Sequence, residues 1–340
     1  MRNRRVRNQP IETVEKPKNK RCIYFTFSQA NQSWKNHRIL AQYFLAFDTL
    51  EEVYENKEMT FDVVLFYDNP QILSFPWKGR TLNQFPWLKK IKYDKNENKM
   101  NDDMVHKWTN LHKIWNDYET IMYLDSDIKF YQPIEILFDA FEYSTSRIAA
   151  VGDLPASGKV VKEYLNHRKH LTYAKDQKYW LNNRRDGLLL MNGGQWIFKP
   201  KKFQDGFNIS DVYTHYLIDH KAWKKEVGWE EKRGGQNEDE ENTINIVAHL
   251  YGDGNIFEMK DYIEIGASIN RLGGRHLPPH GPDECPIQKQ TCIHHYMGSL
   301  FKSFIPPKYW PYDEGHPTVR CHVCADGTIS HHLPSGGKPK

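Results

Sequence analysis

The sequence predicts an α/β fold with a Rossmann-like, mostly parallel sheet flanked by helices. An aromatic and β-branched segment at 21–28 precedes a helical apolar pattern over 34–56, and a second apolar strand follows at 61–69. A crossover helix between two such strands indicates a parallel pair with a right-handed connection. Within 119–124, both alternating sets are apolar, Ile121 with Tyr123 and Met122 with Leu124, as expected for a strand buried on both faces in the middle of a parallel sheet.

The other elements follow in chain order. In the first helix the apolar side chains recur at helical spacing, at Ile39, Tyr43, Phe44, Phe47, Leu50 and Val53. Further strands are expected over 87–94, 147–155 and 187–200, and helices over 102–118 and 237–254, the second ended by glycine. The helix over 102–118 places Val105, Trp108, Leu111, Ile114 and Trp115 on one side. Residues 156–185 are polar and are expected to form helix or loop.

Composition predicts a globular chain, and the order of the expected elements favours one α/β domain over two smaller ones. Of the 340 residues, 39% are hydrophobic and 14% aromatic, which is enough for a sizeable core. We expect the domain to span 21–303, with a flexible basic leader at 1–20 and a loop-rich tail at 304–340. No run approaches the roughly 18 consecutive apolar residues of a membrane helix. Because the leader also lacks the apolar segment of a signal peptide, we expect no membrane span and a cytoplasmic location.

The positive charge of the chain is concentrated at its start. Residues 1–21 hold eight Lys or Arg and two Glu, and the remainder has a net charge of −2. A body of that charge is not a basic platform for nucleic acid, so no nucleic-acid partner is expected.

Two aspartates, Asp125 and Asp127, stand directly after the apolar strand over 119–124. In open α/β sheets, ligands bind at the carboxyl ends of the strands. Two carboxylates this close raise each other's pKa unless a cation neutralises them, and Mg²⁺ or Mn²⁺ prefers oxygen ligands together with substrate phosphates. The pair therefore predicts a metal–diphosphate site. An Asp-Ser-Asp turn whose side chains cap the next residues is the alternative.

Two further features favour a ligand at this edge of the sheet. Lys107 and His112 lie on the preceding helix, where a cation would reach the same edge. Asn192, Gly193 and Gly194 interrupt an apolar strand, and consecutive glycines there indicate close approach of a ligand or another backbone, or a β-bulge.

Three segments together resemble the nucleotide-sugar glycosyltransferases of the GT-A fold, in particular the glycogenin-like glycosyltransferase family 8. These segments are NLHKIWNDYETIMYLDSDIKF (110–130), LLLMNGGQWIF (188–198) and HHYMGSLFK (294–302). The resemblance runs over about residues 21–303. It implies transfer of a sugar, hexosyl or pentosyl, from a nucleoside-diphosphate sugar, with UDP as the expected nucleotide, to a glycan or protein acceptor. It also implies retention of the anomeric configuration.

The resemblance assigns roles to individual residues. Mn²⁺ or Mg²⁺ would be bound by Asp125, Asp127 and His295, with His294 as the alternative to the histidine. The donor would be bound by Thr26, Phe27, Asp68, Lys107, Ser126, Asn192, Gly193, Gly194 and Lys302. The catalytic carboxylate would be Asp239 or Glu240, orienting sugar hydroxyls or acting as a base. Glu240, Glu241 and Asn245 fall where the family has Asp, Gln and Asn, and Lys302 comes one residue later than the family's lysine.

Two other functions remain open from the sequence. A metal-dependent phosphohydrolase acting on a nucleotide or sugar phosphate would also use such an aspartate pair, usually with further carboxylates for a second ion. A non-enzymatic scaffold with a zinc-bound tail is the other alternative. No G-x-G-x-x-G follows the first strand, and the glycine spacing at 152–160 does not fit a P-loop.

The C-terminal cysteines predict a structural zinc site. Cys285, Cys292, Cys321 and Cys324 form C-x6-C and C-x2-C pairs, and four thiolates would hold Zn²⁺. The first spacing is wider than in the usual zinc knuckle, so free thiols in a loop-rich tail are the alternative. An odd total of five cysteines without a signal peptide argues against a disulfide framework.

Overall fold

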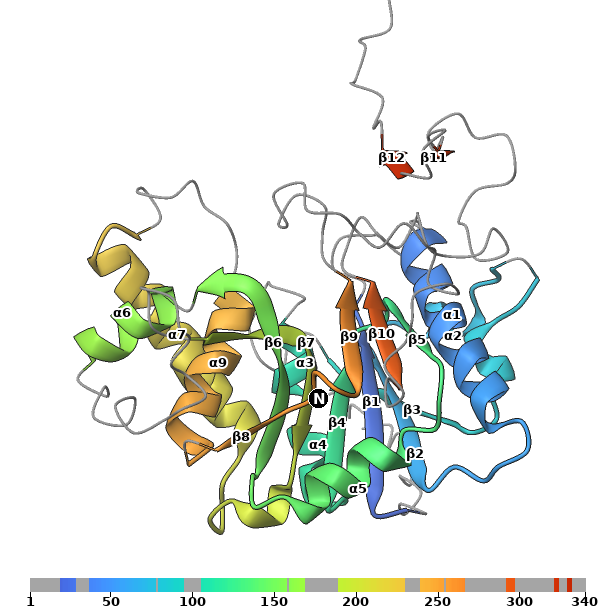
Figure 1. Ribbon diagram of the computed structural model, residues 1–340, viewed down its shortest axis with the longest axis horizontal. Coiled ribbons are helices and arrows are strands. Elements are labelled where there is room, and N and C mark those ends of the chain that lie inside the picture. Colours follow the sequence, from blue (N-terminus) through green and yellow to red (C-terminus); the bar gives the residue numbers. More distant parts are fainter. Residues whose placement is uncertain are drawn as a thin grey trace, which may run out of the picture.

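The computed structural model shows a central sheet between two layers of helices (Figure 1). It describes residues 19–28, 37–77, 79–94, 105–157, 159–168, 189–229, 239–253, 255–266, 292–296, 321–323 and 329–331. Most of the predicted leader and of the predicted tail lies outside these residues.

The elements have the following bounds. The strands are β1 Arg21–Phe27, β2 Phe61–Tyr67, β3 Leu88–Lys92, β4 Thr120–Leu124, β5 Ile128–Phe130, β6 Ile148–Ser157, β7 Leu189–Phe198, β8 Ile256–Glu258, β9 Ile263–Gly266, β10 Ile293–Tyr296, β11 Cys321–Val323 and β12 Ile329–His331. The helices are α1 His37–Tyr54, α2 Gln71–Ser74, α3 His106–Thr109, α4 His112–Trp115, α5 Glu135–Tyr143, α6 Lys159–His167, α7 Ile209–Glu226 and α9 Asp239–Tyr251, with short 3₁₀ turns η2 Leu82–Gln84 and η6 Pro200–Lys202.

The main sheet has seven strands in the order β3-β2-β1-β4-β7-β6-β8. Strands β3, β2, β1 and β4 are mutually parallel, and so are β6 and β8, whereas β7 runs antiparallel to both β4 and β6. The prediction of a mostly parallel sheet is thereby confirmed. Strand β4 is the fourth of the seven, so the aspartate pair follows a central strand, and its antiparallel neighbour β7 brings the two glycines to that strand's end.

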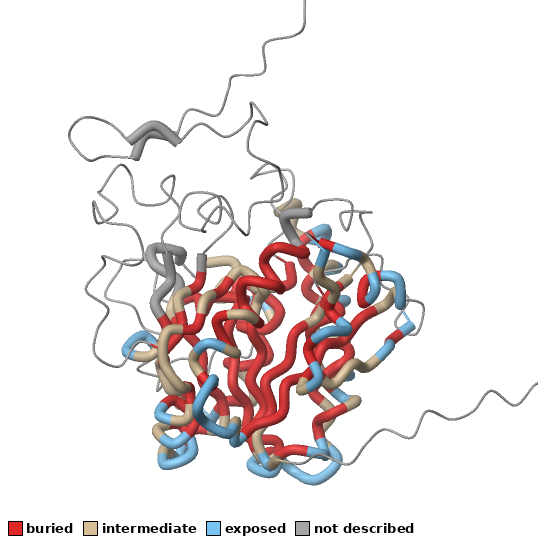
Figure 2. Tube along the Cα trace, turned by 90° about the vertical axis from the view of Figure 1, so that its right-hand side faces the viewer, coloured by how far each residue is buried: buried red, intermediate tan, exposed pale blue. Residues whose placement is uncertain are grey.

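The apolar strands are buried on both faces because helices cover both sides of the sheet (Figure 2). Met122 and Leu124 join the core under α1 and α5. Ile121 and Tyr123 join the core under α3, α4, α6, α7 and α9. The two alternating sets of side chains expected for the strand over 119–124 therefore pack against opposite faces in the structure. Because both faces of β4 are packed, the strand holds the aspartate pair rigidly at its end.

The single helix expected over 102–118 is wrong for the described part of that range, which forms two short helices, α3 and α4. The cause is the hydroxyl of Ser210, which donates to the Trp108 carbonyl at 3.0 Å and accepts from the His112 amide at 2.9 Å. In an uninterrupted helix that amide would bond to that carbonyl directly. A side chain inserted into the helical hydrogen-bond ladder breaks the helix there.

A second, three-stranded sheet, β5-β10-β9, lies beside the first and was not predicted. Strand β10 pairs antiparallel with β5, which begins directly after the aspartate pair, so His295 lies opposite Ile128. This pairing links the C-terminal histidines to the end of β4. Within the described residues, no helix combines the length and apolar character needed to cross a membrane.

Candidate active site

The aspartate pair lies at the carboxyl end of β4. The Asp125 amide donates to the Gly194 carbonyl of β7 at 2.8 Å, which continues the β4–β7 ladder one residue beyond the strand. The side chains of Asp125 and Asp127 are both partly exposed. The pair is thus fixed by a central strand and its neighbour, while both carboxylates remain within reach of a ligand.

His295 completes a group of three ligating side chains. One oxygen or nitrogen atom from each of Asp125, Asp127 and His295 lies within 4.8 Å of the others, and His295 Nε2 is 3.0 Å from Asp127 Oδ1. The ring is buried, which by itself lowers its pKa, but the Asp127 and Asp125 carboxylates together outweigh burial and the pKa of His295 is raised. His294, the alternative, lies outside this group, and burial lowers its pKa to about 4.

Two observations fit a metal ion at this group. Within the part of the chain that the structure describes, Nδ1 of His295 is buried without a hydrogen-bond partner. A Cβ on Gly194 would lie 2.6 Å from Asp125 Oδ2 and 3.0 Å from the His295 ring, so only glycine leaves the space between them open. Two carboxylates and an imidazole suit Mn²⁺, and the oxygen-rich set also suits Mg²⁺.

Two glutamates of the first turn of α9 flank the neighbouring glycine. The Gly193 amide donates to Glu241 Oε2 at 3.2 Å, and a Cβ on Gly193 would lie 3.4 Å from a carboxylate oxygen of each of Glu240 and Glu241. Burial raises the pKa of Glu240, and the charge of the Lys107 ammonium acts in the opposite direction. The strand interrupted by two glycines therefore passes directly between the metal-ligating group and two carboxylates.

Asp239 and Glu240, the two candidates for the catalytic carboxylate, point to different surroundings. Asp239 is buried against α7, where Lys224 Nζ donates to it at 2.8 Å. Glu240 accepts from Trp108 Nε1 and lies 3.1 Å from Lys107 Nζ. Of the two, only Glu240 contacts residues that also contact the aspartate pair.

Lys107 is the predicted cation that reaches this edge. Its ammonium lies 3.6 Å from Asp125 Oδ1 and donates to the Gly193 carbonyl at 3.0 Å. The predicted approach of His112 is not what the structure shows, because this side chain lines a hollow at the amino end of β4. The interruption of the helix at Ser210 separates the two residues into α3 and α4.

The residues predicted to bind the nucleotide follow the strands beside β4. Thr26 and Phe27 end β1, and Asp68 follows β2. In the described structure the buried hydroxyl of Thr26 has no hydrogen-bond partner, whereas Phe27 is stacked on Tyr43 with 4.7 Å between ring centroids. Ser126 donates to Gln42 at 3.2 Å. These positions agree with a ligand at the carboxyl edge, and the individual roles stay predictions.

Asn192 supports the glycine pair. Its side chain accepts from the Gly194 amide at 2.8 Å. Asn245 of α9 fixes Met191, the residue before Asn192. Its side chain forms hydrogen bonds of 2.8 Å with both the amide and the carbonyl of Met191. The helix that carries the glutamates is thereby fixed to the strand that carries the glycines.

Two predictions fall largely outside the described residues. Lys302 lies there, as do Cys285 and Cys324. Of the four cysteines predicted to bind zinc, Cys292 is a buried free thiol in the structure, and burial raises its pKa to about 12. A protonated thiol in that environment gives no support for Zn²⁺, which binds thiolate.

Sequence reasoning assigned three residues of this site to the core or left them out. Tyr123 and Trp108 count as apolar positions by periodicity, yet the Tyr123 hydroxyl bonds Asp125 Oδ1 and the Trp108 indole bonds Glu240. Glu241 was recognised as matching a family position but was not among the predicted site residues. The sequence signal that points to Tyr123 is its place two residues before the first aspartate, on the opposite strand face from Met122.

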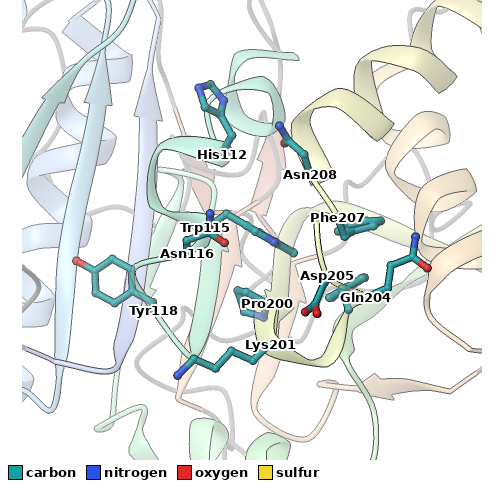
Figure 3. Close-up of a pocket in the computed structure, with 12 residues that line it drawn as sticks. His112, Trp115, Asn116, Tyr118, Pro200, Lys201, Gln204, Asp205, Phe207 and Asn208 are labelled. Carbon is teal, nitrogen blue, oxygen red and sulfur yellow. The ribbon is translucent and has the colours of Figure 1, made fainter.

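A separate hollow of about 540 Å³ lies at the other edge of the sheet, where β4 begins and β7 ends (Figure 3). Trp115 and Phe207 approach each other across it, with 5.9 Å between ring centroids. His112 lines it, whereas none of the residues assigned to the metal, the donor or catalysis does. The chemistry predicted from the sequence is therefore at the opposite edge from this hollow.

Comparison with known proteins identifies the fold. No family model and no curated protein matches the sequence. Among solved structures, mouse xyloside xylosyltransferase 1 is similar with a TM-score of 0.51 and 14% identity, over 85% of this chain and 99% of that one. The galactosyltransferase LgtC, in complex with donor and acceptor sugar analogues, has a TM-score of 0.46 and 12% identity, over 85% of this chain and 98% of that one.

The architecture is accordingly the GT-A fold of glycosyltransferases, as the sequence predicted. Identities this low establish the fold alone. Membership of glycosyltransferase family 8 is not confirmed by them.

Proposed function

We propose that this chain is a metal-dependent glycosyltransferase that moves a sugar from a nucleoside-diphosphate sugar, UDP-linked, to a glycan or protein acceptor. The observation that carries the proposal is the convergence of Asp125, Asp127 and His295. Segments 168 residues apart in the chain meet at the carboxyl edge of a GT-A sheet, where such sheets bind their ligands.

Asp125, Asp127 and His295 would hold Mn²⁺ or Mg²⁺. When bound, the ion supplies positive charge for the diphosphate that leaves the anomeric carbon. The protein contributes ligands fixed before the reaction by β4, β7 and β10, which lowers the cost of reorganisation. We assign Lys302 to the same diphosphate, from the resemblance.

The residues beside the metal ligands would bind the rest of the donor. We assign Thr26, Phe27 and Asp68 to the nucleoside, and Ser126 to its ribose. The sugar would lie beside Asn192, Gly193 and Gly194, as the resemblance implies, next to the metal ligands and the two glutamates that contact these glycines. A side chain at Gly194 would instead clash with Asp125 and His295.

Glu240 is our candidate for the catalytic carboxylate, and Asp239 is the alternative that the sequence left open. The anomeric centre becomes oxocarbenium-like during transfer, as in glycoside hydrolysis. Glu240 would orient hydroxyls of the sugar in a retaining reaction, or accept the proton of the acceptor hydroxyl in an inverting one. Retention is our proposal, from the resemblance, and the configuration of the product by NMR decides it, since an inverted anomer refutes this part.

The test of the function is nucleotide release from a panel of UDP- and GDP-linked sugars, with Mn²⁺ or with EDTA. We expect release to require the metal and to be lost in Asp127→Ala. The control is Asp205→Ala, which removes an exposed carboxylate at the hollow on the opposite edge and should leave activity unchanged. Equal activity in EDTA, or in Asp127→Ala, contradicts the proposal.

The phosphohydrolase alternative is less well supported. Among the described residues, Asp125, Asp127 and His295 form the one group of three or more side chains able to hold a metal. A hydrolase of that kind usually needs further carboxylates for a second ion. Release of inorganic phosphate from a nucleotide or sugar phosphate, without sugar transfer, would favour it.

A further inference from the structure

We infer that Lys107 is a positioning residue: together with Tyr123 it fixes Asp125 from inside the protein, so that one oxygen of this carboxylate is presented to the divalent cation. The inference rests on the metal site of the proposed function. It gives Lys107 a different role from the direct donor contact that the sequence predicted, and it assigns a role to Tyr123.

The ammonium of Lys107 is surrounded by protein. The residue is 3% exposed, and its Nζ lies 3.0 Å from the Gly193 carbonyl, 3.1 Å from Glu240 Oε1 and 3.6 Å from Asp125 Oδ1. The Tyr123 ring lies beneath it, with its centroid 5.0 Å from Nζ. An ammonium has three N–H groups, and three protein oxygens surround this one. Its position therefore favours action through Asp125 and Glu240 over contact with the donor.

The two oxygens of Asp125 face different partners. Oδ1 accepts from the Tyr123 hydroxyl and is the oxygen nearest Lys107. Oδ2 is the oxygen that a Cβ on Gly194 would meet, on the side where that Cβ would also meet the His295 ring. Because Oδ1 is held, the carboxylate cannot rotate freely, and Oδ2 stays directed towards the side of His295.

Partners of this kind are known to affect metal sites. Removing a residue that orients a metal ligand typically weakens metal affinity by about 10- to 100-fold.

Two other roles for Lys107 predict different results. If its charge acted only by repelling the cation, removing that charge would strengthen metal binding. If it contacted the donor, its removal would weaken nucleotide binding and leave metal affinity unchanged.

The experiment is a titration of Mn²⁺ alone into the full chain, with free Mn²⁺ followed by electron paramagnetic resonance. We expect Lys107→Met and Tyr123→Phe each to weaken Mn²⁺ binding about 10-fold or more. Tyr123→Phe removes one hydroxyl and no charge, so it keeps the test decisive if Lys107→Met fails to fold. The control is Lys199→Met, a buried lysine over Phe141 that donates to the Ser144 carbonyl.

The outcomes separate this inference from the proposed function. Unchanged or stronger Mn²⁺ binding by Lys107→Met and Tyr123→Phe, with wild-type binding intact, overturns the positioning role. Weakening of the same size in Lys199→Met also overturns it, because the effect would then be general destabilisation. A wild-type chain that binds no Mn²⁺ instead contradicts the metal site itself.

Discussion

Asp125 and Gly194 face each other across the antiparallel pair β4–β7, joined by a hydrogen bond of 2.8 Å from the Asp125 amide to the Gly194 carbonyl. The same glycine leaves open the space beside Asp125 Oδ2, where a Cβ would lie 2.6 Å from that oxygen. Backbone pairing and the missing side chain together let Asp125 Oδ2 and the His295 ring approach the same point of β7. Both depend on Gly194.

Gly194→Ala is expected to abolish Mn²⁺ binding. Its backbone is not in the left-handed region, so the backbone itself accepts alanine, but the new methyl group would displace Asp125 or His295. Gly193→Ala is the matched control, because its Cβ would lie in ordinary van der Waals contact, 3.4 Å from the nearest carboxylate oxygens. Calorimetric titration with Mn²⁺ measures both, and equal binding by Gly194→Ala and wild type contradicts the geometry of the site.

Asp239→Asn and Glu240→Gln should affect different properties, the first stability and the second transfer activity. Asp239 is the partner of buried Lys224, and removal of one charge of a buried pair costs on the order of 3 kcal/mol. We expect Asp239→Asn to lower the free energy of unfolding by about that amount while the folded fraction keeps its activity. Glu240→Gln should lose transfer activity. Urea unfolding and kcat of each variant give the comparison.

The opposite pattern would transfer the catalytic role to Asp239. If Glu240→Gln retains full kcat while Asp239→Asn, folded, loses it, then the ion pair with Lys224 opens during the reaction. The contact between Glu240 and Lys107 would then contribute to stability and not to catalysis.

Ser210→Ala should destabilise the fold by about 1–3 kcal/mol. Its hydroxyl bonds both the Trp108 carbonyl and the His112 amide, and the variant leaves these two groups without that partner. Urea unfolding measures the change, and Ser74→Ala, whose exposed hydroxyl makes one bond of 3.4 Å, is the control. Equal stability of the two variants would mean that α3 and α4 rejoin into one helix at no cost.

His220 makes the protein less stable in mild acid. Burial lowers its pKa to about 4 from the ordinary 6.5, so below pH 6.5 the unfolded chain takes up a proton that the folded chain does not accept. The contribution of this group to the free energy of unfolding should therefore be constant above pH 6.5. Between pH 6.5 and 4 the free energy of unfolding should fall by on the order of 3 kcal/mol. His294 titrates in the same window, so we compare wild type with His220→Leu. A slope unchanged by the substitution contradicts the assignment.

The main sheet could be predicted because its strands carry strong local signals. The strands β1, β2 and β4 are apolar runs bounded by turns, and the structure places each where the pattern indicated. The aspartate pair was predictable for the same reason, since a strand buried on both faces specifies where it ends.

What the sequence did not predict depends on contacts between distant segments. The break between α3 and α4 is made by Ser210, about 100 residues away in the chain. Strand β10 has four residues, and its extended conformation depends on pairing with β5 and β9. The polar role of Tyr123 is hidden because its ring fits the apolar pattern while only its hydroxyl reaches Asp125.

The measurement that tests the central claim most directly is calorimetric titration of UDP into the full chain, with and without Mn²⁺, repeated on Asp127→Ala. We predict binding that requires both the ion and Asp127. If neither UDP nor GDP binds in the presence of Mn²⁺, or if binding is the same in Asp127→Ala, there is no metal–diphosphate site at the end of β4.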